Sequence, residues 1–312
     1  MSELRQVPKL SLAQYSQATG PAEKTAFATA LYQALSEYGF VVISDHGISQ
    51  DTFNKAYSLT QSLFNLPLQS KSNYETGSGQ RGYISFGKEK AAGNDFPDLK
   101  EYWHVGPELD NTSPYINEYP KNVWPEEIPE FKPFFSELYH SLEDVAKTLF
   151  VALAQAMNLD DNFFVDMITD GNSIQRLIHY PALDGLNVGS SIRAAAHGDI
   201  NLMTLLIGAT DSGLELLDRN GEWLAVENQE GDLVIDTGDM MARLTNNQLP
   251  ATIHRVVNPS DMSKPRYSIP FFVHPRNSVM LECLDQFQGE GKQFAPISAG
   301  DFLQQRLREN GF

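Results

Sequence analysis

The feature that most constrains the fold is a series of short apolar segments between residues 173 and 275, separated by turn signals. The segments include SIQRLIHYP, HGDINLMTLLIG, GLELL, EWLAV, GDLVIDTG, ATIHRVV and RYSIPFFVHP, and Asn220-Gly221 lies between two of them. Segments of this length are typical of strands in an antiparallel sandwich or barrel, and Asn-Gly is typical of a hairpin turn. This half of the chain is therefore predicted to be mainly β, and a double-sheet jelly roll is one such architecture.

Helical patterns flank these strands. Residues 21–38 carry apolar side chains at helical spacing, with Pro21 at a tolerated first-turn position and Gly39 placed to end the helix. GFVVIS, residues 39–44, is predicted to be a buried strand that leads into a second helix, and residues 70–122 are expected to be rich in loops. A continuous apolar stripe over residues 131–157 predicts a long helix, which needs a broad surface to lie on.

Charge and cysteine content narrow the class of protein. The 312-residue chain has 23 Lys and Arg against 40 Asp and Glu, a net charge of −17, which disfavours binding to nucleic acid and to anionic membranes. The single cysteine, Cys283, excludes an internal disulfide and a thiolate metal cluster. The start of the chain has no signal-peptide pattern, so a cytoplasmic protein is expected, with its oligomeric state open between monomer and homodimer.

The segment AAAHGDINLMTLL places two metal-ligand side chains, His197 and Asp199, two positions apart. Side chains two apart in a strand point to the same face, so the imidazole and the carboxylate would converge. A third candidate, His254, lies 57 positions later on a separate predicted strand. Two histidines and one carboxylate form the facial site that holds ferrous iron and leaves positions open for an organic acid and dioxygen.

A candidate anion-binding group follows His254 by twelve residues, in RYSIPFF. Arg266 and Ser268 lie two apart on one strand face, and a guanidinium group suits bidentate binding of a carboxylate. Tyr180, in RLIHYP on the strand before His197, carries a hydroxyl that would reach the same anion. Each of these motifs occurs by chance in many proteins, whereas their combination is specific.

The motifs HGD, LTNNQLPATIHRV and RYSIPFF occur in this order, together with EYGFVVISDHGIS, RGYISFGKE, GLELLDRNGEWLAV and TGDMMARLTNN. With them the sequence resembles the isopenicillin N synthase-like branch of the non-haem Fe(II)/2-oxoglutarate-dependent oxygenases over nearly its whole length. The resemblance implies a double-stranded β-helix, or jelly roll, with the long helix packed on its outside. Residues 1–120 would form the family's N-terminal helix and strand region and residues 121–312 its oxygenase core, as one compact unit.

The resemblance also implies the chemistry. Fe(II) would be held by His197, Asp199 and His254, and the enzyme would use O2 and 2-oxoglutarate to hydroxylate, desaturate or cyclise a small organic molecule, releasing succinate and CO2. Arg266 and Ser268 would bind the distal carboxylate of 2-oxoglutarate. Tyr180 matches a tyrosine that contacts that carboxylate in many members. The sequence departs from many plant members two positions earlier, where it has Ile178 in place of asparagine.

Four further residues are candidates for substrate binding: Arg81, Tyr83, Arg193 and Phe272. If Arg81 or Arg193 faces the pocket, an acidic or amino-acid-like substrate is expected. Leu202, Leu205 and the IPFF run are expected to form an apolar wall that limits water at the site. The remaining histidines are expected to be structural or on the surface, and they are His46, His104, His140, His179 and His274.

Three other functions are compatible with parts of this pattern. An oxidase of the isopenicillin N synthase type would use the Arg266 and Ser268 pair for its substrate's carboxylate and need no 2-oxoglutarate. A catalytically silent jelly-roll binding protein would not require the complete triad. A zinc hydrolase could use His-Asp-His ligands, but it would not require a carboxylate-binding arginine and serine beyond the metal.

Overall fold

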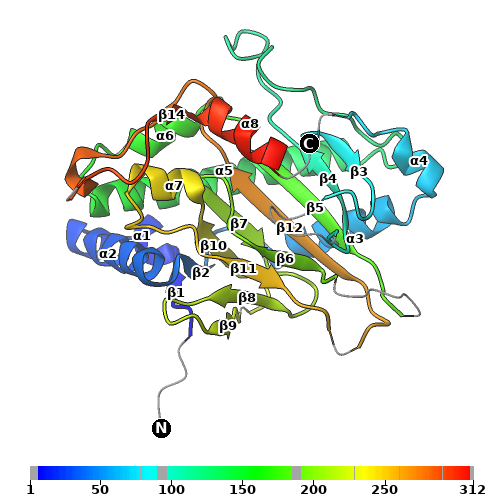
Figure 1. Ribbon diagram of the computed structural model, residues 1–312, viewed down its shortest axis with the longest axis horizontal. Helices are drawn as coiled ribbons and strands as arrows, with labels where there is room; N and C mark the ends of the chain where they lie inside the picture. Colours follow the sequence, from blue (N-terminus) through cyan, green and yellow to red (C-terminus); the bar gives the residue numbers. More distant parts are fainter. Residues whose placement is uncertain are drawn as a thin grey trace.

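Two β-sheets packed face to face form the centre of the protein (Figure 1). This computed structural model describes residues 6–77, 79–89, 97–184, 191–227, 229–259, 261–289 and 291–309. The larger sheet has eight strands in the order β1-β2-β10-β7-β12-β5-β4-β3, and the smaller has four in the order β6-β11-β8-β9. The bounds of the strands are β1 Lys9–Ser11, β2 Phe40–Ser44, β3 Gly82–Ile84, β4 Glu101–Val105, β5 Ile174–Tyr180, β6 Ala194–His197, β7 Met203–Ile207, β8 Leu214–Leu217, β9 Trp223–Ala225, β10 Leu233–Thr237, β11 His254–Val256, β12 Arg266–Val273, β13 Met280–Leu281 and β14 Ile297–Ser298.

The strands from β5 to β12 form the predicted jelly roll. They divide between the sheets, with β10, β7, β12 and β5 adjacent in the larger sheet and β6, β11, β8 and β9 making up the smaller one. The β8–β9 hairpin turns at Asn220-Gly221, as the dipeptide predicts. The mainly β fold with a double-stranded β-helix core is thereby confirmed.

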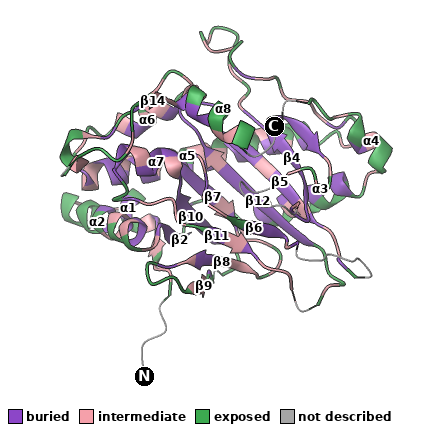
Figure 2. Ribbon diagram, in the orientation of Figure 1, coloured by how far each residue is buried: buried purple, intermediate pink, exposed green. Residues whose placement is uncertain are grey.

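Helices cover the outer face of the larger sheet (Figure 1). The longest, α5, spans Phe131–Ala156 and buries its apolar stripe in one large core with α2, α3 and the sheet. In Figure 2 the strands are mostly buried, whereas green, exposed residues are concentrated on the outer helices and loops. None of the described helices is long and apolar enough to span a lipid bilayer. The helices are α1 Ala13–Ser16, α2 Pro21–Tyr38, α3 Gln50–Phe64, α4 Leu68–Ser72, α5 Phe131–Ala156, α6 Phe163–Ile168, α7 Asp239–Leu244, α8 Ala299–Glu309 and the 3-10 helix Asp285–Phe287.

The end of α2 is fixed by Gly39, which directs the chain into β2. Gly39 adopts a φ of +67°, in the left-handed region that glycine tolerates best. A Cβ atom there would lie 2.1 Å from Thr252 Oγ1, whose hydroxyl donates to the Tyr38 carbonyl at 2.8 Å. The close approach therefore ties the α2–β2 junction to the segment that leads into β11.

Alternation along β12 separates the site from the core. Arg266, Ser268 and Phe272 face the space between the two sheets, whereas Ile269 and Phe271 pack in the core beneath the helices. Leu202 and Leu205 also belong to that core and line neither cavity described below. The apolar wall expected from Leu202, Leu205 and the IPFF run is therefore wrong for both leucines and for Ile269 and Phe271, whereas Pro270 and Phe272 do line the site. In β7 it is Leu206, not Leu205, that faces the site.

The N-terminal region extends the larger sheet on both sides. β1 and β2 lie next to β10, and β3 and β4 lie next to β5. β2 pairs with β10 in an antiparallel register, Val42 opposite Val234, and β4 pairs with β5, Tyr102 opposite Ile178. Strands from both parts of the chain thus share one sheet around the jelly roll.

Candidate active site

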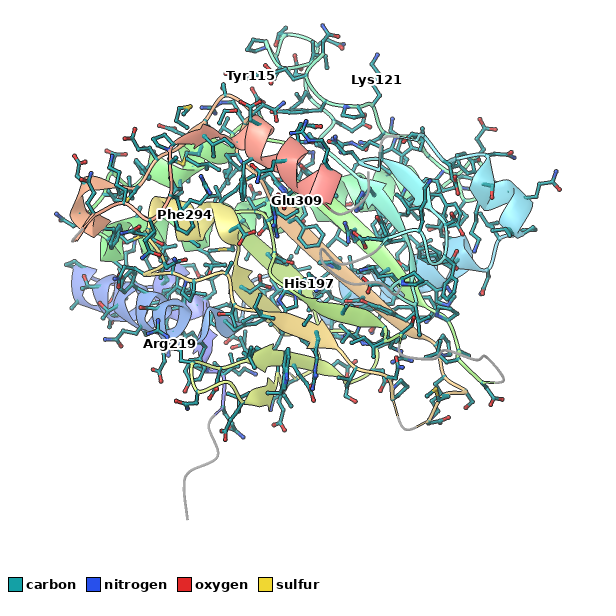
Figure 3. All side chains as sticks on the ribbon, in the orientation of Figure 1. Tyr115, Lys121, His197, Arg219, Phe294 and Glu309 are labelled. Carbon is teal, nitrogen blue, oxygen red and sulfur yellow. The ribbon has the colours of Figure 1, made fainter. Side chains whose placement is uncertain are left out.

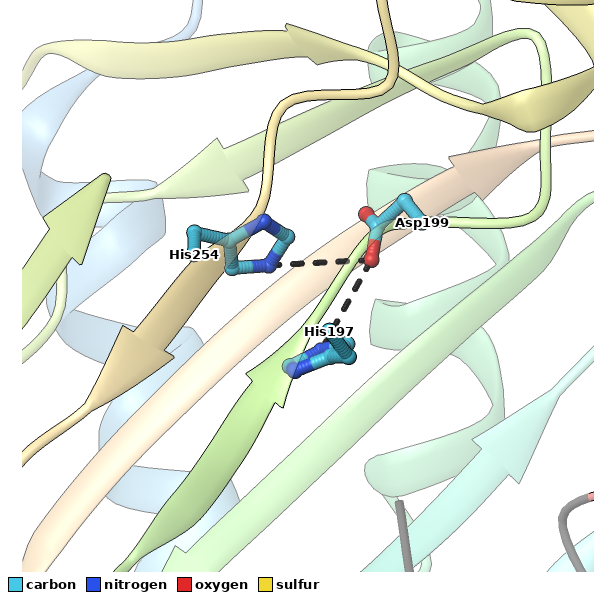
Figure 4. Close-up of side chains that lie close together, drawn as sticks. All are labelled: His197, Asp199 and His254. Atoms are coloured by element: carbon cyan, nitrogen blue, oxygen red, sulfur yellow. Dashed lines mark ion pairs between the residues drawn. The ribbon is translucent and has the colours of Figure 1, made fainter. Parts of the chain in front are cut away.

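Three side chains from separate positions in the chain meet between the two sheets (Figure 4). Asp199 Oδ1 lies 3.9 Å from His197 Nε2 and 3.7 Å from His254 Nε2. The three ligand atoms all lie within 4.8 Å of one another. Because donors of one ion each lie about 2 Å from it, small side-chain rotations would bring all three onto a single metal. The set of two nitrogens and one oxygen suits ferrous iron.

The strands explain why these residues meet, although not as one continuous strand. β6 ends at His197, and Asp199 lies in the segment that turns toward β7, so the single strand expected over HGDINLMTLLIG is wrong. β11 pairs antiparallel with β6, and His254 lies directly opposite His197 in the register. His197 is labelled near the middle of the view in Figure 3, and its side chain keeps 35% of its surface exposed.

Backbone carbonyls orient both imidazoles. His197 Nδ1 donates to the Ala195 carbonyl at 2.7 Å, and His254 Nδ1 donates to the Thr252 carbonyl at 3.2 Å. Each bond places the proton on Nδ1 and leaves the Nε2 lone pair toward Asp199, as a metal ligand requires. Burial, with the nearby His254, lowers the pKa of His197 to about 4, so this ring is neutral at pH 7.

Asp199 is held from behind by Thr204, which is oriented in turn by Asn201. Thr204 Oγ1 donates to Asp199 Oδ2 and accepts from Asn201 Nδ2 at 2.9 Å, which leaves Oδ1 facing the histidines. Burial alone would raise the pKa of Asp199, but its interactions with the two histidines and the Thr204 bond outweigh burial and lower that pKa. Burial, followed by the Asp199 charge, raises the pKa of the neighbouring Asp236 well above its ordinary value.

A narrow cavity of about 60 Å³ leads from the triad to Arg266, Ser268 and Tyr180. The backbone register places Arg266 opposite Tyr180, with the guanidinium carbon 5.1 Å from the tyrosine ring centre. Arg266 Nε donates to the Asp211 carbonyl at 3.1 Å, whereas Nη1 is buried and lacks a hydrogen-bond partner among the described residues. An orphaned guanidinium donor at the end of such a cavity fits the carboxylate of an organic acid.

Ile178 lies on the same face as Tyr180 and also lines this narrow cavity. The departure from the asparagine of many plant members therefore places an aliphatic side chain on the wall of this cavity.

A second cavity of about 380 Å³ opens on the other side of the triad, within the size range of small-molecule sites. Its apolar wall includes Ile174, Ile200, Ile253, Leu303 and Leu307. The last two residues belong to α8, drawn in red in Figure 1, so the C-terminal helix forms one side of the cavity.

Arg176 lies between the two cavities, and the sequence analysis did not identify it. Its side chain lines both spaces, with the guanidinium carbon 4.3 Å from the Tyr102 ring centre and 5.0 Å from that of Phe272. The signal was present in β5, because residues two and four positions before Tyr180 share its face. Applied to Ile178 and then to Arg176, this alternation would have placed the arginine at the site.

The structure brings one of the four substrate candidates, Phe272, to the larger cavity. Arg81, Tyr83 and Arg193 line neither cavity. Arg81 is buried and donates to the Gln80 carbonyl and to Asn172 Oδ1, and this burial lowers its pKa to about 10.

Tyr83 and Arg193 have other partners. The Tyr83 hydroxyl donates to Glu101, and Arg193 pairs with Asp211 at 3.2 Å and donates to the Lys264 carbonyl. With Arg81 and Arg193 both turned away from the cavity, the sequence argument for an acidic or amino-acid-like substrate loses its basis.

The other histidines are separate from the triad. His46 bonds the Gly231 carbonyl at 2.7 Å, His140 is exposed, and His179 pairs with Glu101. His104 and His274 line the larger cavity, a placement that the sequence did not predict. Burial lowers the pKa of His274 to about 4 and that of His104 well below its ordinary value, so both rings are neutral at pH 7.

Comparison with known proteins supports the same chemistry. Residues 7–127 match the family described as non-haem dioxygenase in morphine synthesis N-terminal, and residues 171–275 match the 2OG-Fe(II) oxygenase superfamily. The chain is 30% identical to the 2-oxoglutarate-Fe(II) type oxidoreductase ppzD of Metarhizium rileyi, over 97% of this chain and 91% of the relative. It is 31% identical to the proline hydroxylase buaE of Petromyces alliaceus, over 92% and 94% of the two chains.

Comparison with solved structures gives the same family. A 2OG-Fe(II) oxygenase family protein from Caulobacter crescentus is 41% identical, with a TM-score of 0.87 and 99% of each chain covered. A full-length Neurospora crassa protein solved in complex with alpha-KG is 26% identical, with a TM-score of 0.85 and coverage of 96% of this chain and 95% of that chain. Relatives named for 2-oxoglutarate, or solved with it, favour dependence on that acid over the oxidase and binding-protein alternatives.

Proposed function

Because the chain belongs to the isopenicillin N synthase-like family of non-haem Fe(II)/2-oxoglutarate-dependent oxygenases, we propose that His197, Asp199 and His254 are its iron ligands. The observation that carries this assignment is the convergence of the three ligand atoms within 4.8 Å. The protein is a 2-oxoglutarate-dependent dioxygenase. When bound, Fe(II) and 2-oxoglutarate supply the activation of O2, with succinate and CO2 as the products of the co-substrate.

We assign the distal carboxylate of 2-oxoglutarate to Arg266, Ser268 and Tyr180. The unpartnered, buried Arg266 Nη1 supports this role, because a carboxylate would satisfy it. The Asp211 carbonyl fixes the opposite edge of the guanidinium and so keeps its free edge directed into the narrow cavity. Pro270 and Leu206 on the same walls exclude water around the acid.

The substrate is a small organic molecule, which we place in the larger cavity. The size of that cavity supports the placement, as do a relative named as a proline hydroxylase and the Neurospora crassa protein, which was also crystallised with thymine. Hydroxylation, desaturation and ring closure all remain within the proposed chemistry. Phe272 lies on the shared wall of the two cavities and is the one sequence-derived substrate candidate that we retain.

We further propose a cytoplasmic enzyme that acts as a monomer or homodimer, without a nucleic-acid or membrane partner. The net charge of −17 and the single cysteine support this assignment. We also propose that residues 1–120 and 121–312 work as one unit, because strands from both parts lie in the same sheet.

An anaerobic titration tests the assignment of the metal site. Addition of Fe(II) and 2-oxoglutarate to the parent enzyme should produce the visible charge-transfer band of the chelate, and His197→Ala and Asp199→Ala should lose both the band and Fe(II)-dependent succinate formation. His140→Ala removes an exposed histidine as the matched control and should behave like the parent. If both triad variants convert 2-oxoglutarate to succinate at the parent rate, the assignment is wrong.

A further inference from the structure

Arg176 is held in one orientation by the residues around it. Tyr102 and Phe272 contact its guanidinium group with their rings, and its Nε donates to His104 Nε2 at 2.6 Å. His104 Nδ1 in turn donates to the Gly79 carbonyl at 3.1 Å, which fixes the neutral tautomer whose Nε2 accepts. A side chain fixed at three points is preorganised for binding.

One end of this guanidinium remains available to a ligand. Nη1 lies 3.5 Å from each carboxylate oxygen of Glu89, a long and weak contact, and Nη2 has no partner in the part of the chain that the structure describes. The side chain keeps 18% of its surface exposed and lines the cavity. Because Nε is bonded to His104 and Nη1 faces the Glu89 carboxylate, Nη2 is left to donate on its own, which suits a single acceptor oxygen better than a bidentate carboxylate.

The charges of the cavity wall already balance without a ligand. Lys100 Nζ lies 2.8 Å from Glu89 and 2.9 Å from Asp98, so the two carboxylates face the two cations Lys100 and Arg176. An uncharged ligand preserves this balance. An anionic ligand would add an unpaired buried negative charge beside Glu89, which is costly in a desolvated site.

α8 contributes an apolar part of the cavity wall. Leu303 and Leu307 of α8 face the space, and Arg306 of the same helix is paired with Asp239 at 3.3 Å. Lys100 and Arg306 are thus engaged by carboxylates, whereas Arg176 has only its long contact with Glu89 and remains the cation most available to a ligand, in a cavity that also has aliphatic side chains. Such a wall favours a compact molecule with an apolar body and one oxygen-bearing end.

We propose that Arg176 binds the substrate, and that the substrate is uncharged and presents a carbonyl or amide oxygen to its Nη2. The assignment rests on the proposed oxygenase function and defines the class of substrate for it. The apolar body of the substrate lies against Ile174, Leu303 and Leu307, which line the same cavity.

The test uses pairs of probes that differ in charge and little in shape: cyclohexanecarboxamide and cyclohexanecarboxylate, benzamide and benzoate, nicotinamide and nicotinate. Each is titrated by calorimetry into the anaerobic enzyme loaded with Fe(II) and 2-oxoglutarate. We expect at least one amide to bind more tightly than its acid. Arg176→Met should weaken the binding of that amide by roughly ten- to hundredfold, which is the effect expected when one hydrogen bond to a charged group is lost.

Two further variants distinguish the loss of the Arg176 donor from a general effect of lost charge or lost stability. Arg219→Met removes the same charge from the β8–β9 turn, away from the cavity, and should leave amide binding unchanged. Arg176→Gln keeps an N–H donor without the charge and should retain part of the amide binding even if Arg176→Met is too unstable to use. The charge-transfer band should still form in the Arg176 variants.

Tighter binding of the acids, equal amide binding by Arg176→Met, or no binding of any amide would overturn the inference. Loss of the charge-transfer band in the Arg176 variants would also overturn it, because Arg176 would then serve 2-oxoglutarate rather than the substrate. If the band fails to form in the parent enzyme, the proposed function itself fails, so the two failures are distinguishable.

Discussion

Replacement of Thr204 by valine tests whether the residues behind Asp199 contribute to metal binding. Thr204 is buried, donates to Asp199 Oδ2 and accepts from Asn201 Nδ2. Valine has nearly the same shape, so Thr204→Val removes the hydroxyl with little change in packing. A hydrogen bond to a charged group contributes about 1.5–3 kcal/mol. Removal of a partner that orients a metal ligand typically lowers metal affinity by about 10- to 100-fold, or about 1.4–2.8 kcal/mol.

These two estimates agree, so Thr204→Val should weaken Fe(II) binding by about 10- to 100-fold. Anaerobic calorimetric titration of Fe(II) measures this change directly, without a substrate. Thr204→Ser retains the hydroxyl and serves as the matched control, with an affinity close to that of the parent. Urea unfolding of the metal-free proteins would separate a general loss of stability from a loss of metal affinity.

The reasoning is refuted if Thr204→Val binds Fe(II) as tightly as the parent. It is also refuted if Thr204→Ser is weakened as much as Thr204→Val, since the shape of the side chain and not its hydroxyl would then control Asp199.

Three further predictions concern the carboxylate-binding Arg266, the end of α2 at Gly39 and the buried Glu101. Arg266→Lys should weaken the binding of 2-oxoglutarate by roughly 10- to 100-fold, because an ammonium group cannot reproduce the two parallel hydrogen bonds of a guanidinium group. An unchanged dependence of succinate formation on the concentration of 2-oxoglutarate would contradict this. Gly39→Ala places a Cβ 2.1 Å from Thr252 Oγ1 at a φ of +67° and should destabilise the fold by more than about 1 kcal/mol in urea unfolding; an unchanged midpoint would count against it. Burial alone would raise the pKa of Glu101, but hydrogen bonds from His179, Lys71 and Tyr83 outweigh it and lower the pKa. Since the folded-state pKa lies below the unfolded one, Glu101→Gln should be less stable than the parent at pH 7, and the difference should shrink as the pH falls below about 4, whereas a constant difference would exclude this origin.

Local signals explain what the sequence predicted well. The helix over residues 21–38 has the expected bounds, because Pro21 and Gly39 fix its ends through their own backbone preferences. The Asn220-Gly221 turn is equally local. The meeting of His197, Asp199 and His254 depends instead on the pairing of β6 with β11, and it was predicted through family resemblance and motif spacing.

The incorrect predictions of which side chains face the site have a common physical cause. Both faces of the larger sheet are buried, one beneath helices and one against the smaller sheet, so alternation shows which residues share a face but not which face holds the site. Leu205 was assigned to the wrong side in this way, and Arg176 was overlooked. The break between β6 and β7 also escaped notice, because HGDINLMTLLIG contains no proline and its one internal glycine lies between two ligands.

The strands that flank the jelly roll in the larger sheet have a consequence for how this protein can be divided. Without β2 and β4, the outer backbone N–H and C=O groups of β10 and β5 would be left unpaired along buried, apolar strands. Such exposed borders recruit strands from other molecules and promote aggregation. A gene fragment that encodes residues 171–275 alone should therefore yield insoluble material when it is expressed.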